Sequence, residues 1–327
     1  MSDKNMHERI NQISKETGVP TKKVLDLLFA LRDGEVVENN ELVRKVGVSK
    51  NALNKVKERL ASVLEPVSKD TQLDGDHVQE IRAIFDEGYK FEDAMWTILE
   101  DDKYKKASEL LETISDKRPS PERRFDQFTA TIETTARRAS LLQFFGDIKG
   151  KRILFLGDDD FTSIGVASLG LAAHIEVLDV DKRILESIKG VAETEGFTIS
   201  TTRSDLTQRL PNQLMRNFDI VFTDPPYTEN GMNLFLSRAI QALDPDNHAA
   251  RIYTCYGNSD RARERYLPVQ RLFTESGLMM RWVFDGFNRY RGAESIGSSS
   301  ALLIADVTPK TKPLVKGGYD KPIYTNN

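Results

Sequence analysis

The sequence predicts an α/β fold, with a doubly wound, mostly parallel sheet in its second half and a winged-helix-like helical domain before it. Two observations support this prediction. From Lys151 onward, short apolar strand runs alternate with helical segments, which is typical of a parallel sheet covered by helices. Between Met6 and Asp76, short helical segments are instead separated by polar turns. The proline-rich segment from Arg118 to Pro121 interrupts helical structure and marks the boundary between the two patterns.

The N-terminal region has a helix-turn-helix layout. A helical apolar face that includes Val24 ends before Gly34, a second helix ends at Gly47, and Ser49 is a suitable N-cap for a third. The segment 63–73 then has the place of a wing. Domains of this kind serve either in dimerisation and docking or in DNA binding. We favour the first role because the net charge of the chain is −4.

We therefore divide the chain into three parts. Residues 1–117 form the winged-helix-like domain with a helical connector, and residues 118–307 form the α/β domain. Residues 308–327 are rich in Lys, Pro, Gly and Thr and lack periodicity, so we expect a flexible C-terminal tail. This tail is either an end without a role or a lid in which Tyr319 and Tyr324 cover a bound substrate.

Composition excludes several classes of protein. The only cysteine, Cys255, cannot form an internal disulfide and rules out a multi-cysteine metal site. We see no signal peptide and no apolar run of the ~20 residues that a membrane span requires, so we expect a cytoplasmic protein. The histidines have no metal-ligand spacing, and we assign no metal to them: His7, His77, His174 and His248.

An acidic loop follows the first predicted strand. After residues 153–156 come Gly157 and three consecutive carboxylates, Asp158, Asp159 and Asp160. Ligands of doubly wound sheets bind beyond the carboxyl ends of the strands, so this loop lies where a substrate would bind. Like charges raise each other's pKa and repel phosphate, whereas they suit a polycation. The alternative is a solvated acidic turn.

Acids after the next two strands suit a nucleoside. Asp179 ends the second strand, where a carboxylate usually accepts hydrogen bonds from ribose hydroxyls. Asp181 is the second choice for that role, because it equally suits the N-cap of the following helix. Asp205 follows the third strand and is either an acceptor for the adenine amino group or a loop aspartate.

The strongest motif follows the fourth strand. In Asp224-Pro225-Pro226-Tyr227 the prolines fix the backbone and leave carbonyls without local donors. Asp224 and a proline carbonyl can accept hydrogen bonds from an attacking amine. The ring of Tyr227 can pack on that amine when it is charged. We therefore predict that these four residues bind the acceptor substrate.

Polar residues before the first strand of the sheet are further candidates. Asp126 and Gln127 precede a predicted helix that leads into the sheet. We expect Gln127 at the donor pocket and Asp126 near the acceptor, and the alternative is an exposed face.

Through these motifs, the chain resembles the branched-chain polyamine synthases of thermophilic archaea and bacteria, also called N4-bis(aminopropyl)spermidine synthases. The resemblance covers nearly the whole length. It rests on the R-P-x-P and F-D-Q segments between Arg118 and Gln127, the G-D-D-D loop that begins at Gly157, and the D-P-P-Y motif that begins at Asp224. The G-D-D-D loop is the most specific, whereas D-P-P-Y is shared with amino-methylating enzymes.

The resemblance implies a methyltransferase-like (Rossmann-like) fold and a homodimer. It implies decarboxylated S-adenosylmethionine (S-adenosylmethioninamine) as co-substrate, with no tightly bound cofactor. Aminopropyl would move to the secondary amine of spermidine or a related linear polyamine, giving branched polyamines and 5′-methylthioadenosine. The resemblance also places Asp158, Asp159 and Asp160 beside the reactive amine as catalytic residues. The residues expected at the co-substrate are Gly157, Asp179, Asp181, Asp205 and Gln127.

Two other functions compete with this one. An S-adenosylmethionine-dependent amino-methyltransferase acting on DNA or RNA fits D-P-P-Y and the helix-turn-helix. Three carboxylates at the ligand edge fit it poorly, because its substrate is a polyanion. A regulator that senses polyamine or nucleoside through a degenerate transferase domain is the non-catalytic alternative, and the intact D-P-P-Y motif argues against degeneracy.

Overall fold

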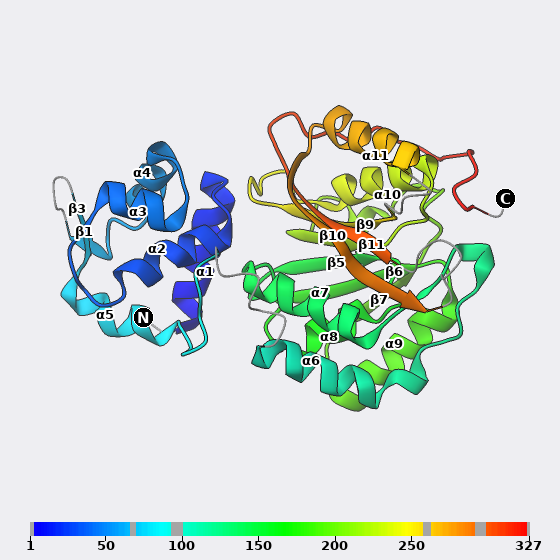
Figure 1. The fold of residues 1–327 in the computed structure, drawn as a ribbon, viewed down its shortest axis with the longest axis horizontal. Coiled ribbons are helices and arrows are strands. Elements are labelled where there is room, and N and C mark those ends of the chain that lie inside the picture. Colours follow the sequence, from blue (N-terminus) through cyan, green and yellow to red (C-terminus); the bar gives the residue numbers. More distant parts are fainter. Residues whose placement is uncertain (1–2, 66–69, 93–100, 258–262, 292–298, 326–327) are drawn as a thin grey trace.

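The computed structural model has two units that follow one another along the chain (Figure 1). It describes residues 3–65, 70–92, 101–257, 263–291 and 299–325. The smaller unit is N-terminal, and the larger one contains the sheet. In the described part of the chain, no helix combines the length and the apolar character needed to cross a membrane.

The N-terminal unit is a helical cluster with a small antiparallel sheet, in which the strand order is β1-β3-β2. The expected turn chemistry is confirmed: Gly47 ends one helix in the left-handed region at φ 66°, and the Ser49 hydroxyl caps the next by accepting from the Ala52 N–H. The winged-helix assignment stays a prediction. The elements are α1 (Asp3–Thr17), α2 (Thr21–Leu31), β1 (Val37–Glu38), α3 (Asn39–Val46), α4 (Lys50–Arg59), β2 (Leu64–Glu65), β3 (Asp70–Leu73) and α5 (Val78–Ala83).

The second unit contains the expected doubly wound sheet, in the strand order β4-β10-β11-β9-β8-β5-β6-β7. The strands from β9 to β7 are parallel, and β11 and β10 add antiparallel pairs at one side. The strands are β4 (Thr129–Ala130), β5 (Arg152–Leu156), β6 (His174–Asp179), β7 (Ser200–Arg203), β8 (Ile220–Thr223), β9 (Arg251–Tyr256), β10 (Met279–Arg291) and β11 (Ser299–Asp306).

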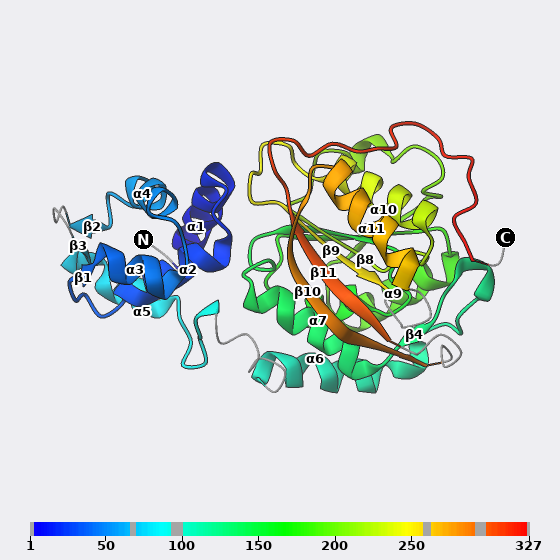
Figure 2. The ribbon, with the colours of Figure 1, turned by 45° about the horizontal axis from the view of Figure 1, so that its top comes forward.

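Helices cover both faces of this sheet (Figures 1 and 2). The central strands are buried on both sides, so they are continuously apolar rather than alternating. One core lies under α6 (Asp102–Thr113), α7 (Ile132–Phe144), α8 (Thr162–Ser168) and α9 (Lys182–Glu195), and the other under α10 (Glu229–Ala242) and α11 (Arg263–Glu275).

The structure differs from the expected division of the chain at α6. We placed this helix in a connector that belongs to the N-terminal domain, but it packs on α7 and α8 in the larger unit. Its buried residues Ala107 and Leu111 lie in the same core as the sheet. The proline-rich segment therefore follows a helix of the second unit instead of separating the two units.

The N-terminal unit contacts the amino ends of the strands. In α1, the Asn11 amide donates to the Lys149 carbonyl before β5, at 3.0 Å. Lys15 forms an ion pair of 2.6 Å with Asp244 before β9. The same end of α1 accepts a backbone hydrogen bond from His248. The carboxyl ends of the strands, where ligands of such sheets bind, lie at the opposite edge.

The C-terminal segment also differs from the expected flexible tail. Residues 308–325 lie along the second unit (Figure 2). Ile323 is buried in the core under α10, and Arg238 donates to the Gly317 carbonyl at 2.7 Å. The segment lacks periodicity because it is held by side chains of α10 and by isolated backbone contacts rather than by a helix or a ladder. Its composition, rich in Lys, Pro, Gly and Thr, gave no sign of these contacts.

Candidate active site

The predicted site residues come together at the carboxyl edge of β5, β6 and β8. Gly157 leaves β5 with φ 74°, a left-handed conformation that favours glycine. Its N–H donates to the Leu178 carbonyl at 2.8 Å, which joins this loop to the end of β6. The acidic loop therefore begins beside Asp179, as expected for a shared ligand site.

The three carboxylates of the acidic loop have different surroundings. Asp158 accepts hydrogen bonds from the Thr162 and Ser163 N–H groups, at 2.7 and 3.0 Å, and so satisfies the N-terminus of α8. Burial raises the pKa of Asp158 to about 7, although these hydrogen bonds lower it. Asp158 thus has a structural task in addition to its position in the site.

Asp160 is held from two sides. It accepts from the Ala130 N–H at 2.6 Å and from Arg138 Nη1 at 2.9 Å. Burial raises the pKa of Asp160, and the charge of Arg138 opposes that rise. Its carboxylate is 2% exposed in a filled polar network, so it is less available to a substrate than its neighbour Asp159.

Asp159 differs from both neighbours. Among the described residues, no group donates a hydrogen bond to its carboxylate, which stays partly exposed. Burial and the charges of Asp160, Asp179 and Asp224 raise the pKa of Asp159 well above its ordinary value. A carboxylate with a raised pKa and open hydrogen-bonding positions can hold an ammonium group or accept a proton.

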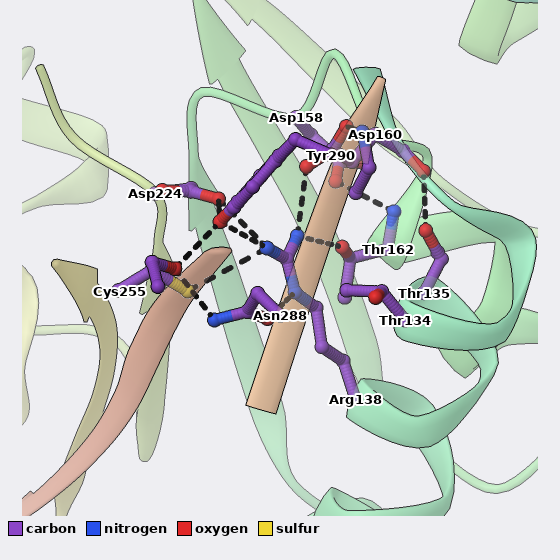
Figure 3. Close-up of polar contacts among 12 residues, drawn as sticks. Thr134, Thr135, Arg138, Asp158, Asp160, Thr162, Asp224, Cys255, Asn288 and Tyr290 are labelled. Carbon is purple, nitrogen blue, oxygen red and sulfur yellow. Dashed lines mark hydrogen bonds and ion pairs between the residues drawn. The ribbon is translucent and has the colours of Figure 1, made fainter. Parts of the chain in front are cut away.

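Arg138 of α7 is the central cation of the site, and we did not find it in the sequence. Figure 3 shows its guanidinium between Asp160 and Asp224. Nη2 donates to Asp224 at 2.7 Å and to the Tyr290 hydroxyl at 3.1 Å, and Nε donates to Asn288 at 2.9 Å. A signal was present, because Arg138 stands at helical spacing from buried residues that precede and follow it: Thr134, Thr135, Leu141 and Leu142.

The D-P-P-Y motif is fixed by this cation. Besides Arg138, Asp224 accepts from the Tyr290 hydroxyl at 2.7 Å and the Tyr227 hydroxyl at 2.9 Å. Its carboxylate is therefore largely occupied, and direct acceptance from an attacking amine is harder than the sequence indicated. The Pro226 carbonyl accepts from the Thr228 N–H, whereas that of Pro225 accepts no hydrogen bond within the described residues.

The carboxylates predicted to bind the donor nucleoside also differ in their hydrogen bonds and burial. Asp179 accepts from the backbone N–H groups of Asp181 and Asp158, at 2.8 and 3.2 Å, and burial raises its pKa to about 6. Asp181 caps α9 and pairs with Arg183 at 2.6 Å, as the alternative interpretation held. Asp205 is exposed and accepts from the Thr207 N–H at 2.9 Å.

Gln127 and Asp126 link the site to segments outside the sheet. The Gln127 amide donates to Asp181 at 3.3 Å, so it lies beside the candidate donor acids. The Asp126 carboxylate accepts from the N–H and the hydroxyl of Thr325, at 2.7 and 2.6 Å. Beside it, the rings of Phe125 and Tyr324 are 6.0 Å apart.

Tyr324 of the C-terminal segment interacts electrostatically with several acids of the site. Burial raises the pKa of Tyr324 to about 12, with smaller contributions from Asp205, Asp179 and Asp126. The C-terminal segment therefore passes close to candidate residues for both substrates, namely Asp179 and Asp205 for the donor and Asp126 for the acceptor. Within the described residues, no group of three or more His, Cys, Asp or Glu is arranged to hold a metal ion.

Comparison with known proteins agrees with this geometry. Residues 106–318 match the family model described as the branched-chain polyamine synthase A C-terminal domain. An uncharacterised protein of Methanocaldococcus jannaschii is 40% identical over 209 residues, which is 64% of this chain and 51% of that protein. N(4)-bis(aminopropyl)spermidine synthase of Thermococcus kodakarensis is 35% identical over 188 residues, or 56% of this chain and 53% of that one. The chain thus spans about half the length of these curated relatives.

Solved structures have the same fold. The branched-chain polyamine synthase of Thermus thermophilus, solved with N4-aminopropylspermidine and 5′-methylthioadenosine, has a TM-score of 0.62 at 24% identity and covers 98% of both chains. A candidate RNA methyltransferase of Pyrococcus horikoshii has a TM-score of 0.50 at 17% identity, over 62% of this chain and 100% of that one. The expected methyltransferase-like fold is confirmed.

Proposed function

This chain belongs to the family of the branched-chain polyamine synthase A C-terminal domain, and from that premise we propose that it is an aminopropyltransferase. The donor is decarboxylated S-adenosylmethionine, and the acceptor is the secondary amine of spermidine or a related linear polyamine. The products are a branched polyamine and 5′-methylthioadenosine. The observation that carries the proposal is the acidic loop at the carboxyl edge of the sheet, where Asp159 alone of the three carboxylates has no hydrogen-bond donor among the described residues.

The acceptor would be bound by charge and by shape. A linear polyamine is a polycation, and Asp158, Asp159 and Asp160 lie within one turn beside Asp179 and Asp224. The ring of Tyr227 packs 5.3 Å from that of Tyr256 and offers an aromatic wall to a charged amine. We assign acceptor binding to this wall, to Pro225 and Pro226, and to Asp126 and Asp224. Asp224 contributes charge rather than a free hydrogen-bond acceptor, because Arg138, Tyr227 and Tyr290 occupy its carboxylate.

In the transfer step, the unprotonated secondary nitrogen attacks the aminopropyl carbon next to the sulfonium. A new N–C bond forms, the C–S bond breaks, and its electron pair stays on sulfur as neutral 5′-methylthioadenosine. The proton of the alkylated nitrogen goes to Asp159, the general base in this proposal. The sulfonium is already a good leaving group, so positioning supplies most of the remaining rate.

The donor nucleoside would lie on the side of β6. Asp179 is our candidate for the ribose hydroxyls and Asp205 for the adenine amino group. Gly157 leaves room for the nucleoside, because a Cβ built on it meets no atom within 4 Å. Gln127 and Asp181 orient this side through their mutual hydrogen bond. A carboxylate on the donor would face the acidic loop, which disfavours intact S-adenosylmethionine.

The test is to incubate the protein with decarboxylated S-adenosylmethionine and spermidine and to analyse the products by mass spectrometry. We expect spermidine to gain the mass of one or two aminopropyl groups, with 5′-methylthioadenosine as by-product. Parallel reactions contain S-adenosylmethionine with DNA or RNA. Methylated nucleic acid without aminopropylated spermidine would instead favour the methyltransferase to which D-P-P-Y also points.

The assembly and the location of the chain are further parts of the proposal. We propose a homodimer that acts in the cytoplasm, and the family resemblance supports the homodimer. Light scattering on the purified chain measures the first, and a monomeric mass would contradict it.

A further inference from the structure

We propose that Arg138 is a positioning residue of this site, whose guanidinium joins the loop after β5 to the loop after β8 and so fixes Asp159 and the Pro225 carbonyl relative to each other. This inference rests on the proposed aminopropyl transfer and names a residue that acts through others. The Asp159 carboxylate and the Pro225 carbonyl accept no hydrogen bond from the described residues, and Arg138 binds the residue next to each of them. It pairs with Asp160, next to Asp159, and with Asp224, next to Pro225.

The contacts of Arg138 are those of a built junction. The guanidinium is fully buried, and each of its three nitrogens has a partner at 2.7–2.9 Å: Nε with Asn288, Nη1 with Asp160 and Nη2 with Asp224. These partners come from β10 and from the loops after β5 and β8. The planar fork of a guanidinium can bind three such partners in fixed directions, whereas a lysine ammonium cannot reach them with the same geometry.

Each anchor is also held from outside. Asp160 accepts from the Ala130 N–H at 2.6 Å, and Asp224 accepts from Tyr290 at 2.7 Å. The Tyr290 hydroxyl lies 2.9 Å from that of Ser300 on β11. Arg138 is therefore the one described side chain that bonds to both anchor carboxylates, and its loss would let the two loops separate.

Arg138 also balances charge. The groups that act on Asp159 are Asp158, Asp160, Asp179 and Asp224, and Arg118 adds a positive charge to the same loop. Without the charge of Arg138, Asp224 loses its paired cation, and Asp160 keeps only the charge of Arg118, with which it forms no ion pair among the described residues. The cluster then binds protons more tightly, so the ionised form of Asp159 is present only at higher pH.

Another buried arginine provides a matched control. Arg251 bridges Asp147 at 3.0 Å and Asp306 at 2.8 Å, and it is 1% exposed. It starts β9 at the amino end of the sheet, away from the site. Removing either arginine takes a buried cation away from two largely buried carboxylates, although Asp306 keeps its ion pair with Arg281, so both changes cost stability. Only the change at Arg138 is expected to alter the chemistry.

The experiment compares the pH dependence of kcat/KM for wild type, Arg138→Gln, Arg251→Gln and the double variant Arg138→Gln/Asp160→Asn. We expect the acidic limb of the kcat/KM profile to move to higher pH in Arg138→Gln and to stay at its wild-type pH in Arg251→Gln. In the double variant, which loses one positive and one negative charge, the limb should return to its wild-type pH. A wild-type limb in Arg138→Gln, or an equal shift in Arg251→Gln, would overturn the proposal.

Arg138→Lys keeps the charge and tests the geometry if Arg138→Gln does not fold. We expect kcat to fall by about 10²-fold, the cost of a misplacement on the order of 1 Å, with the KM for the donor unchanged. A wild-type kcat in Arg138→Lys would refute the positioning role. A wild-type protein that neither binds spermidine in calorimetry nor forms product would refute the proposed function, and the role of Arg138 with it.

Discussion

Among single residues, the main result is that three consecutive carboxylates are chemically unequal. Asp158 satisfies the N-terminus of α8, Asp160 is paired with Arg138, and Asp159 receives no hydrogen bond from the described residues. The sequence predicted one acidic patch with a shared role. Burial and hydrogen bonding divide that role, and neither can be read from three identical letters.

The first prediction follows from this inequality. Asp159→Asn should lower kcat by about 10²- to 10⁴-fold, the usual contribution of a general base. It should raise the melting temperature at neutral pH rather than lower it, because no hydrogen bond is lost and a carboxylate that its surroundings disfavour is removed. Asp158→Ala is the matched comparison: it leaves the N–H groups of Thr162 and Ser163 without their acceptor and should cost about 1–3 kcal/mol of stability. Steady-state kinetics and thermal melts measure both, and near-normal turnover in Asp159→Asn would remove Asp159 from the mechanism.

The second prediction concerns Asp179 and pH. Burial raises its folded-state pKa to about 6, from an ordinary value of 3.8. The folded state thus binds this proton more tightly than the unfolded state does. Its stabilising contribution is complete below about pH 4 and is lost as the pH rises through about 6.

The amide in Asp179→Asn cannot ionise, so this variant does not lose stability as the pH rises through about 6. We expect its free energy of unfolding, relative to wild type, to rise by roughly 2–3 kcal/mol between about pH 4 and pH 7. Urea unfolding of both proteins at several pH values measures the difference. A difference that does not vary with pH would show that Asp179 ionises normally in the folded state.

At the level of elements, the sequence predicted the sheet well and its surroundings poorly. Apolar runs identified β5, β6 and β8, and the cap residue Ser49 located the start of α4. The same reasoning misplaced α6, because an amphipathic pattern shows that a helix packs but does not show on which core. It also predicted a flexible C-terminal segment, since isolated side-chain contacts to irregular backbone leave no periodic signal.

Part of the candidate site was predictable because strand topology places it. Residues that directly follow a buried strand are brought to one edge by topology alone, so Asp159, Asp179 and Asp224 were found. Arg138 comes from a helix before the sheet, and Tyr290 comes from an antiparallel strand far along the chain. Their partners are set by tertiary packing, and no local pattern specifies them.

The third prediction tests the C-terminal segment. We expect it to act as a clasp over the acceptor, with Asp126 holding Thr325. Asp126→Ala and Thr325→Ala should each raise the KM for spermidine severalfold and leave kcat nearly unchanged. Tyr319→Phe is the control. It removes the hydrogen bond that the Tyr319 hydroxyl donates to Asn230 of α10, at another point along the C-terminal segment.

Kinetics of these three variants separate two roles of Asp126. A raised KM in Asp126→Ala with a normal KM in Thr325→Ala would mean that Asp126 contacts the substrate itself. Wild-type KM values in both would exclude the clasp. Truncation before Lys312 is a weaker test than the sequence alone suggested, because it also removes the buried Ile323 and so lowers stability.

For the whole molecule, the important feature is where the N-terminal unit docks. α1 contacts the larger unit through Asn11 and Lys15, at the amino ends of β5 and β9. The acidic loop lies at the carboxyl ends of the same sheet. The proposed substrate site and the contact surface of the N-terminal unit therefore lie at opposite edges, and a change at one edge is expected to leave the other intact.

The fourth prediction follows from this separation. Lys15→Met removes the ion pair with Asp244, in which both side chains are partly exposed. We expect a loss of about 1 kcal/mol or less, and kcat and both KM values equal to wild type. Thermal melts and kinetics measure these quantities. Altered kinetics in Lys15→Met would show that the docking edge is coupled to the site.

The docking of α1 has a consequence for how the proposed enzyme can be attached to a surface or to other proteins. The N-terminal unit lies on the side of the strands' amino ends. Tethering the molecule there leaves the route of small diffusing amines free. The chain can therefore be immobilised through its N-terminal unit, on a bead or in a larger assembly, and is expected to turn over at the rate of the free enzyme.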